Sequence, residues 1–355
     1  MRFVHEFAPA RVVFGAGAVG AVGEEVARLG ANRALLIASP SQAAAGDVIA
    51  AALGDRAAAR IGETASHVPA EQATAARRIA AEARCDAIVA VGGGSAIGLA
   101  KIVALAHAIP ILAVPTTYSG SEMTSFWGLT EGGAKVTGRD PRVKPRTVVY
   151  DPALTVTLPV PVSAASGLNA MAHAVEALYG RTTSPVSALM AEDCIRALAS
   201  GLRRVARAPA QLDARAEALY GAFLGGAALE GAVMGLHHKL CHVLGGAFGL
   251  NHADTHAVIL PHATAYNAGA APAAMARIAR ALGGTDAAAG LHALAAEIGA
   301  PTALAALGLA ERDLDRAAEL ATQSPYDNPR PVERASVRAL LGDAFHDREP
   351  AGGAR

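Results

Sequence analysis

The strongest constraint on the fold of this chain is a change of sequence pattern near residue 153. Before it, short apolar runs ending in Gly, Ser, Pro or Thr alternate with Ala-rich stretches of helical spacing. The runs are typical of strands buried on both faces, and they cover residues 33–39, 86–95, 109–117 and 146–152. The stretches between them are expected to be helices over residues 19–30, 70–83 and 95–106. This alternation predicts a parallel sheet with helices on both faces.

Beyond residue 153 the strand pattern is almost absent, and apolar residues recur at helical spacing. Helices are expected over residues 163–180, 187–206, 214–233, 272–283, 286–299 and 311–323. The chain is long enough for two domains. We therefore predict an α/β domain over residues 1–153 and an all-α domain over residues 154–355.

Composition narrows the classes of partner. Of the 355 residues, 52% are hydrophobic and 17% charged, which excludes a disordered chain. The formal net charge is zero, so nothing favours nucleic acid as a partner. The apolar runs are short and broken, and the first ten residues lack a signal-peptide pattern, so no membrane association is expected. The odd, scattered set of cysteines fits a reducing, cytoplasmic location and comprises Cys85, Cys194 and Cys241.

Two loops follow neighbouring strands of the predicted sheet and carry the residues of a nucleotide site. Gly92, Gly93 and Gly94 allow the backbone to approach a ligand closely, and Ser95 can cap the helix that follows. The amino end of that helix would suit a pyrophosphate. A plain Gly-rich turn is the alternative, but the hydroxyl-rich loop over residues 115–122 on the next strand favours a pocket for a nucleotide.

A second Gly-rich stretch does not decide whether the chain binds a dinucleotide. Gly15, Gly17 and Gly20 have GxGxxG spacing, but no βαβ unit with an acidic residue follows them. In a dinucleotide fold, a carboxylate after the next strand would bind the ribose 2′-hydroxyl. Here that strand runs into Ser39 and Pro40. No carboxylate repels a 2′-phosphate, so we expect either NADH or NADPH to be accepted.

Histidines gather in one short segment of the second half. His238 and His242 are four residues apart and would share a helix face, as would Asn169 and His173. His252 follows ten residues after His242, past a Gly-rich bend, and is expected to bring a donor from a loop toward the helix. A single histidine on an apolar helix is more often a core residue, but six in one segment favour a transition-metal site. The segment over residues 235–262 contains half of the chain's twelve histidines, namely His237, His238, His242, His252, His256 and His262.

Seven stretches in order make the chain similar to the iron-containing alcohol dehydrogenase superfamily over nearly its whole length. They are FGAGAVG, VGGGSAIGLAK, PTTYSGSEMT, DPALTVTLP, GLNAMAHAVEALYG, HHKLCHVLGGAF and NHADTHAVILPH. The resemblance implies a dehydroquinate synthase-like fold, with a dinucleotide-binding α/β domain and a helical catalytic domain. It implies metal ligands at Asn169, His173, His238 and His252, and a substrate-facing histidine at His242.

The chain departs from that superfamily at the first ligand, which is usually Asp and here is Asn169. In this respect it most resembles the maleylacetate reductase branch. A carboxamide brings no charge to offset a divalent ion, so we expect that no metal is required, although Zn²⁺ can bind three histidines. The resemblance implies NAD(P)H-dependent reduction of the C=C bond of 2-maleylacetate to 3-oxoadipate. The alternatives are a metal-dependent alcohol dehydrogenase, with iron or zinc, and a binding protein without turnover.

The chemistry of that reduction suits histidine. Hydride added to the alkene carbon β to the ketone yields an enolate, which hydrogen-bond donors and an acid of middling pKa can stabilise. We therefore predict that the degenerate metal site acts in catalysis, through His173, His238, His242 and His252, with the adjacent Lys239.

The remaining expectations concern ligand contacts and assembly. The substrate implied by the resemblance is a dicarboxylate. The residues expected to contact it are Asn169, His237, Tyr326 and Arg330, although Arg330 could instead pair locally in its loop. The residues expected to contact the cofactor are Ser39, Gly92, Gly93, Gly94, Ser95, Thr116, Thr117, Ser119, Thr124, Lys135 and Leu154. The resemblance also implies a homodimer.

Overall fold

The structure is a computed structural model that describes residues 3, 5, 10–65, 68–132 and 134–350. The chain forms two compact units, and the division falls after Leu158, whereas the sequence pattern changes near residue 153. His5 groups with the second unit, where its Nδ1 atom lies 2.9 Å from the Ser184 hydroxyl.

The first unit is built on a parallel sheet in the order β1-β8-β5-β4-β2-β3. Every residue of β2, β4, β5 and β8 is buried, which explains why these apolar runs were predicted as strands. The two edge strands, β1 and β3, were not predicted. The bounds are β1 (Arg11–Phe14), β2 (Ala34–Ala38), β3 (Ala57–Ile61), β4 (Ala87–Gly92), β5 (Ile111–Pro115) and β8 (Thr147–Tyr150).

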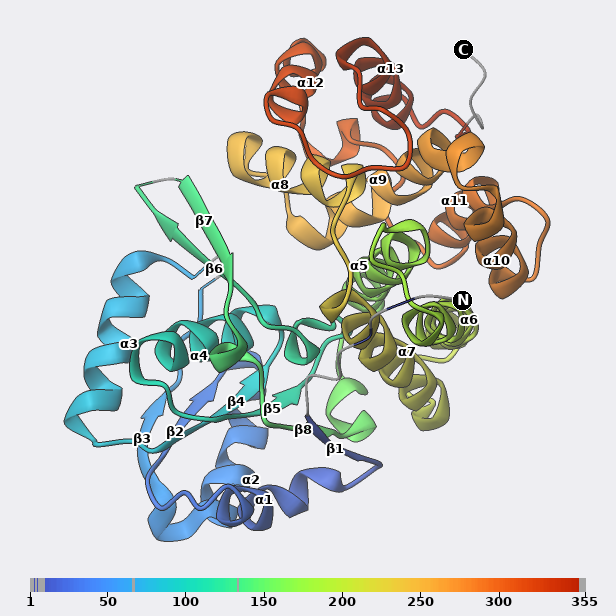
Figure 1. Ribbon diagram of the computed structural model, residues 1–355. Helices are drawn as coiled ribbons and strands as arrows, with labels where there is room; N and C mark the ends of the chain where they lie inside the picture. Colours follow the sequence, from blue (N-terminus) through green and yellow to red (C-terminus); the bar gives the residue numbers. More distant parts are fainter. Residues whose placement is uncertain (1–2, 4, 6–9, 66–67, 133, 351–355) are drawn as a thin grey trace. The chain divides into compact units, whose positions relative to one another are not determined.

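Helices cover both faces of this sheet, as the sequence predicts (Figure 1). Figure 1 shows α1 and α2 on one face, and α3 and α4 on the other. An antiparallel hairpin of β6 and β7, also not predicted, extends from the unit. The bounds are α1 (Val22–Arg28), α2 (Ala43–Leu53), α3 (Ala70–Glu82), α4 (Gly94–His107), β6 (Phe126–Glu131) and β7 (Ala134–Arg139).

The second unit is helical, and all six helices expected from the sequence are confirmed. The histidine-rich segment forms two further helices, α8 and α9, and α13 was also not predicted. The described ranges contain no helix long and apolar enough to cross a membrane. The bounds are α5 (Val160–Tyr179), α6 (Pro185–Arg207), α7 (Leu212–Glu230), α8 (Leu236–Phe248), α9 (His252–Asn267), α10 (Pro272–Leu282), α11 (Ala287–Glu297), α12 (Leu314–Thr322) and α13 (Arg334–Phe345).

The expectation that His252 lies in a loop is wrong, because His252 is the first residue of α9. Asn251 caps this helix, with its side-chain oxygen accepting a hydrogen bond from the Asp254 amide at 3.2 Å. Gly249, in the left-handed conformation at φ 71°, ends α8. The bend therefore joins two helices, and the later histidines have helical spacing as well.

Small residues bring α5, α6 and α7 into close contact. A Cβ atom added at Gly225 of α7 would lie 2.6 Å from the carbonyl oxygen of Ala170 in α5. One added at Gly201 of α6 would lie 2.7 Å from the Ala218 amide nitrogen in α7. Such distances leave no room for a side chain. The Ala and Gly of this segment therefore hold α5, with Asn169 and His173, in a closely packed bundle.

Candidate active site

Three loops meet at the carboxyl edge of the sheet in the first unit. The Thr116 amide donates to the carbonyl oxygen of Gly92 at 3.1 Å. A Cβ atom at Gly92 would lie 2.9 Å from the Ser39 hydroxyl oxygen, and one at Gly93 would lie 2.8 Å from a Thr117 methyl. The ends of β2, β4 and β5 thus bring these five predicted cofactor residues together, and the two glycines are needed for the close approach.

The amino end of α4 opens between these loops. The expectation that Ser95 caps this helix is wrong, because Gly93 is the capping residue and no side chain bonds to the cap. Gly94 is exposed, and a Cβ atom added there would meet nothing within 4 Å. The first-turn amides of Gly94 and Ser95 and the positive end of the helix are therefore available to an anionic group.

Lys101, on α4, holds the loop that follows β5. Its buried ammonium donates to the carbonyl oxygens of Ser121 at 2.7 Å and Phe126 at 2.8 Å, and to the Thr124 hydroxyl at 3.1 Å. Thr124, a predicted cofactor contact, thus bonds within the protein. Ser119, in the same loop, has a buried hydroxyl without a described hydrogen-bond partner.

The other two predicted cofactor contacts, Leu154 and Lys135, do not belong to these three loops. Leu154, at the end of the first unit, packs against the apolar core beneath the sheet. Lys135 belongs to β7, and its side chain is outside the described part of the structure.

The Gly-rich turn after β1 is already occupied by a carboxylate. Asp151, at the end of β8, accepts hydrogen bonds from the amides of Gly17 and Val19, each at 3.1 Å. Because these amides are satisfied internally, the GxGxxG spacing at Gly15, Gly17 and Gly20 serves the junction of β1 with β8.

In the second unit, α5, α8 and α9 bring their histidines into one cluster. The rings of His173 and His238 stack with centroids 5.2 Å apart, and those of His242 and His252 stack at 6.2 Å. His256 lies 4.4 Å from His252 and 5.0 Å from His238, again between ring centroids. Together with His237, these residues form the histidine cluster. His262 contacts His292 instead, at 6.3 Å between centroids.

A buried carboxylate that the sequence analysis missed, Glu176 of α5, organises the start of α8. Its oxygens accept hydrogen bonds from the amides of Gly235 and His237, each at 3.0 Å, and from Nδ1 of His238 at 2.6 Å. The negative charge lies at the positive end of the helix. Since Nδ1 of His238 donates to Glu176, its Nε2 atom faces away from the carboxylate. Glu176 follows His173 by three residues on one helix, and this spacing was the available signal.

Several polar atoms of the cluster are buried without a described hydrogen-bond partner. They are Oδ1 of Asn169, Nδ1 of His173, Nδ1 of His237, Nε2 of His238 and Nε2 of His256. Burial, with the neighbouring imidazoles, lowers the pKa of His173, His237 and His256 well below 6.5, so these rings are neutral at pH 7. Buried polar atoms are normally bonded, so the set is ready for a polar ligand.

Comparison with known proteins agrees with this arrangement. Residues 9–152 match the model of the iron-containing alcohol dehydrogenases, and residues 163–345 match that of the C-terminal domain of the same family. The chain belongs to the iron-containing alcohol dehydrogenase family. It is 50% identical over 349 residues to a maleylacetate reductase of Burkholderia cepacia, covering 98% of this chain and 99% of the relative.

Solved structures give the same result. A maleylacetate reductase from Agrobacterium tumefaciens has a TM-score of 0.95 at 47% identity, covering 99% of this chain and 100% of that one. An iron-containing alcohol dehydrogenase from Corynebacterium glutamicum has a TM-score of 0.94 at 42% identity, covering 99% of each chain. The predicted fold class and family are confirmed.

The family's iron raises the question of whether the residues here fit such an ion. The four positions expected to bind it, Asn169, His173, His238 and His252, offer three imidazoles and a neutral amide, with no charge to balance a divalent ion. The neighbouring carboxylate, Glu176, already has three hydrogen-bond donors. This donor set does not fit the iron site of the family, and no step of the reaction is assigned to a metal.

Three further predicted site residues, the catalytic Lys239 and the substrate contacts Tyr326 and Arg330, lie in different surroundings. Lys239 lies half-buried on α8, between His238 and His242. Tyr326 packs against the apolar core of α8, α9, α12 and α13. The guanidinium of Arg330 lies over the Tyr266 ring, 4.3 Å from its centroid. The described contacts of Arg330 are thus within its own loop and with α9. This agrees with the alternative in which Arg330 pairs locally and does not contact the substrate.

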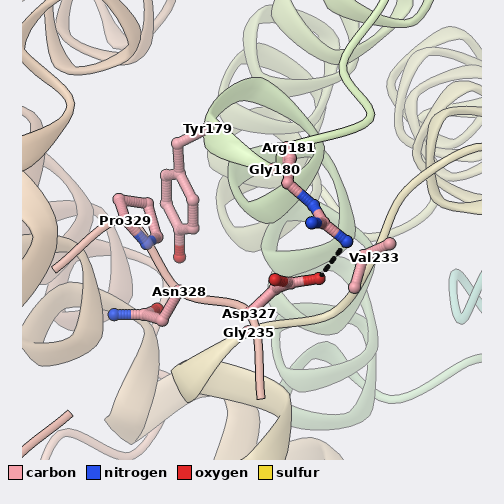
Figure 2. Close-up of a pocket in the computed structure, with 8 residues that line it drawn as sticks. All are labelled: Tyr179, Gly180, Arg181, Val233, Gly235, Asp327, Asn328 and Pro329. Atoms are coloured by element: carbon pink, nitrogen blue, oxygen red, sulfur yellow. Dashed lines mark ion pairs between the residues drawn. The ribbon is translucent and has the colours of Figure 1, made fainter. Parts of the chain in front are cut away.

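A pocket lies beside the start of α8 (Figure 2). Figure 2 shows Arg181 and Asp327 pointing toward one another, and their charged groups are 3.0 Å apart. Asn328, also in its lining, accepts from the Leu236 amide at 3.2 Å and helps Glu176 to hold α8. None of the clustered histidines lines this pocket. We therefore take the histidine cluster, and not this pocket, as the candidate catalytic site. The residues that line the pocket are Tyr179, Gly180, Arg181, Val233, Gly235, Asp327, Asn328 and Pro329.

Proposed function

We propose that this chain reduces the C=C bond of 2-maleylacetate to 3-oxoadipate with NADH or NADPH, in the degradation of aromatic compounds. The observation that carries the proposal is the 50% identity, over almost the full length of both chains, to a maleylacetate reductase. The neutral amide of Asn169 within an all-histidine cluster agrees with a reaction that forms a delocalised enolate rather than an alkoxide.

When bound, NADH or NADPH would supply a hydride to the alkene carbon β to the ketone. The C=C π pair would then form the enolate double bond to the carbonyl carbon, and the C=O π pair would move to the ketone oxygen. A proton then adds to the carbon α to the ketone. The protein has two tasks in this reaction: to donate hydrogen bonds to the enolate oxygen and to supply the proton. Imidazole can do both near pH 7.

We assign these tasks to the cluster. His242, which is half-buried and stacked on His252, is the proposed proton donor. His238 is the proposed wall of the substrate site: its Nδ1 donates to Glu176, which fixes the ring and leaves Nε2 as an acceptor. Lys239 supplies the nearest positive charge on α8 for a substrate carboxylate, with Asn169 as a further polar contact.

The alternative is a metal-dependent alcohol dehydrogenase of the same family, and the Corynebacterium glutamicum relative keeps it open. The two differ in the reacting bond and in the need for a metal. The alternative predicts oxidation of simple alcohols that depends on bound iron or zinc. Our proposal predicts neither.

Both nicotinamide cofactors should be accepted. Ser39 directly follows β2, and the next residues, Pro40 and Ser41, carry no charge. Values of kcat/KM for the two cofactors should differ by less than about a thousandfold, roughly 4 kcal/mol. A stronger preference for NADH would mean that a group other than the residues after β2 excludes the 2′-phosphate.

We also infer that the protein acts as a homodimer in the cytoplasm, and that its partner is the small dicarboxylate alone. Family resemblance supports the dimer, and light scattering at assay concentration measures it. The scattered cysteines and the zero net charge support the location and the absence of nucleic-acid and membrane partners.

The function is tested by mixing purified protein with NADH and 2-maleylacetate. The proposal expects NADH oxidation with formation of an equal amount of 3-oxoadipate, identified by mass spectrometry. The control uses a saturated aldehyde in place of maleylacetate and should be nearly inactive. Aldehyde reduction without 3-oxoadipate formation would overturn the proposal in favour of the alternative.

A further inference from the structure

Two histidines of the cluster that the proposed function leaves without a catalytic role form a hydrogen-bonded pair. Nε2 of His237, on α8, lies 2.8 Å from Nδ1 of His256, on α9. Both side chains are completely buried. The outer nitrogen of each ring, Nδ1 of His237 and Nε2 of His256, has no described hydrogen-bond partner.

The pair has a definite protonation pattern when both rings are neutral. Each neutral imidazole carries one N–H, and one of the two is used between the rings. The outer nitrogens then present one N–H and one lone pair. If Nε2 of His237 donates, Nε2 of His256 carries hydrogen and can donate in turn. The opposite arrangement leaves His256 with an acceptor.

His256 occupies the centre of the cluster. Its ring centroid lies 4.4 Å from that of His252, 5.0 Å from His238 and 6.3 Å from His173. Three of its four ring neighbours are therefore positions at which the family holds its metal. The fourth, His237, fixes the ring from the opposite nitrogen, at 4.7 Å between centroids.

We propose that His256 is a further substrate-contacting residue, and that His237 is the positioning residue that holds it. Nε2 of His256 donates a hydrogen bond to an oxygen of the dicarboxylate substrate or of its enolate. The substrate's carboxylates and ketone offer only acceptors, so its binding selects the form in which His237 donates to His256. This inference rests on the proposed function and adds a residue to the same site.

A different use of these residues is a metal site made of His237, Cys241 and His256, whose ligand atoms lie within 4.8 Å of one another. The two ring nitrogens in question already bond to each other, and the Cys241 sulfur lies 3.7 Å from Nε2 of His237. An ion would have to break that bond, and the outer nitrogens would remain without partners. Substrate contact satisfies Nε2 of His256 instead.

Two substitutions separate the nitrogens of His256. His256→Asn keeps a polar atom near Nδ1, facing His237, but removes Nε2, whereas His256→Gln keeps a polar atom near Nε2. We expect kcat/KM for maleylacetate to fall about a hundredfold in His256→Asn and clearly less in His256→Gln. The affinity for NADH should stay unchanged in both, and circular dichroism serves as the control for folding.

A double-mutant cycle tests the role of His237. His237→Leu should lower kcat/KM about tenfold, and His237→Gln, which keeps a polar atom near Nε2, should recover most of it. If His237 acts only through His256, the double variant His237→Leu/His256→Asn is no worse than His256→Asn alone. Additive losses would contradict the positioning role.

Cys241→Ala is the matched packing control and should retain near wild-type activity without a change in metal content. Loss of bound zinc together with activity in this variant would establish the metal site and overturn the proposal.

A second measurement covers the case in which His256→Asn fails to fold. Side-chain ¹⁵N NMR of the wild-type protein with 3-oxoadipate then tests the proposal, since the product must shift His256 to the Nε2–H form. If the wild type reduces maleylacetate and neither His256→Asn nor the NMR responds, this inference falls while the proposed function stands.

Discussion

At the scale of residues, His238 and His242 lie one turn apart on α8 but have different surroundings. His238 is buried and bonded to Glu176, whereas His242 is half-buried and stacked on His252. We expect His242→Asn to lower kcat by at least about a hundredfold, because it removes the proton donor. His238→Asn keeps a donor facing Glu176 and should change KM more than kcat. Steady-state kinetics of both variants provides the measurement, and a more severe loss of kcat in His238→Asn would indicate a working metal site.

Glu122, in the loop after β5, makes the first unit sensitive to pH. Burial raises the pKa of this carboxyl to about 7, while the Tyr150 hydroxyl, which donates to it at 2.8 Å, and the Lys101 charge oppose the rise. A pKa raised from 4.5 means that the folded state holds the proton more tightly. This stabilisation is complete below pH 4.5 and is lost as the pH rises through 7, by up to about 3 kcal/mol.

Glu122→Gln should therefore remove that dependence, because the amide imitates the protonated acid. Thermal unfolding at pH 5 and pH 8 measures the effect. We expect the melting temperature of the wild type to fall relative to that of the variant as the pH rises across this window. Parallel pH profiles for the two proteins would show that Glu122 is ionised throughout.

Glu176 and His256 show what a reading of the sequence missed at this scale. Four-residue spacing pairs Asn169 with His173 and His238 with His242, but His252 and His256 are not paired while His252 is expected in a loop. Once Asn251 is seen to cap α9, the same four-residue spacing puts His256 on the face of His252. The direct bond between His237 and His256 depends on tertiary packing of α8 against α9, which no local pattern contains.

At the scale of elements, the junction of β4 with α4 carries the cofactor prediction. A side chain at Gly94 would clash with nothing in the protein, so Gly94→Ala should leave stability unchanged. It would obstruct a pyrophosphate at the helix end, and we expect the dissociation constant for NADH to rise at least tenfold, about 1.4 kcal/mol. Gly20→Ala, equally open but in the turn that Asp151 fills, is the control. Titration of NADH fluorescence measures the dissociation constants of both variants. If Gly94→Ala and Gly20→Ala bind NADH with equal affinity, the cofactor does not bind at the start of α4.

The elements that could be predicted are those whose burial is uniform. β2, β4, β5 and β8 are buried throughout, so hydrophobicity alone identified them. β3 has the sequence AAARI, whose alanines favour helix, and it becomes a strand only by pairing with β2. The β6–β7 hairpin carries polar and small residues on partly exposed strands, and no regular alternation marks it.

At the scale of the whole molecule, the proposed chemistry depends on one residue that differs from the metal site implied by the family resemblance. Asn169 removes the negative charge that would balance a metal, and burial keeps His173, His237 and His256 neutral. On the proposed function, the cluster would offer hydrogen bonds and a proton in place of a Lewis acid. This suits an enolate, which needs less stabilisation than the alkoxide of an alcohol dehydrogenase. Nitrogens that are buried without a described partner are available for such contacts with a substrate.

The measurement that tests this account most directly is metal content set against turnover in the same preparation. Protein purified without added metal is analysed for iron and zinc by mass spectrometry. NADH oxidation with 2-maleylacetate is then followed before and after prolonged dialysis against a strong chelator. The account predicts metal far below one ion per chain and a kcat that the chelator leaves unchanged. One iron or zinc per chain, with activity that disappears on its removal and returns on its addition, would contradict it.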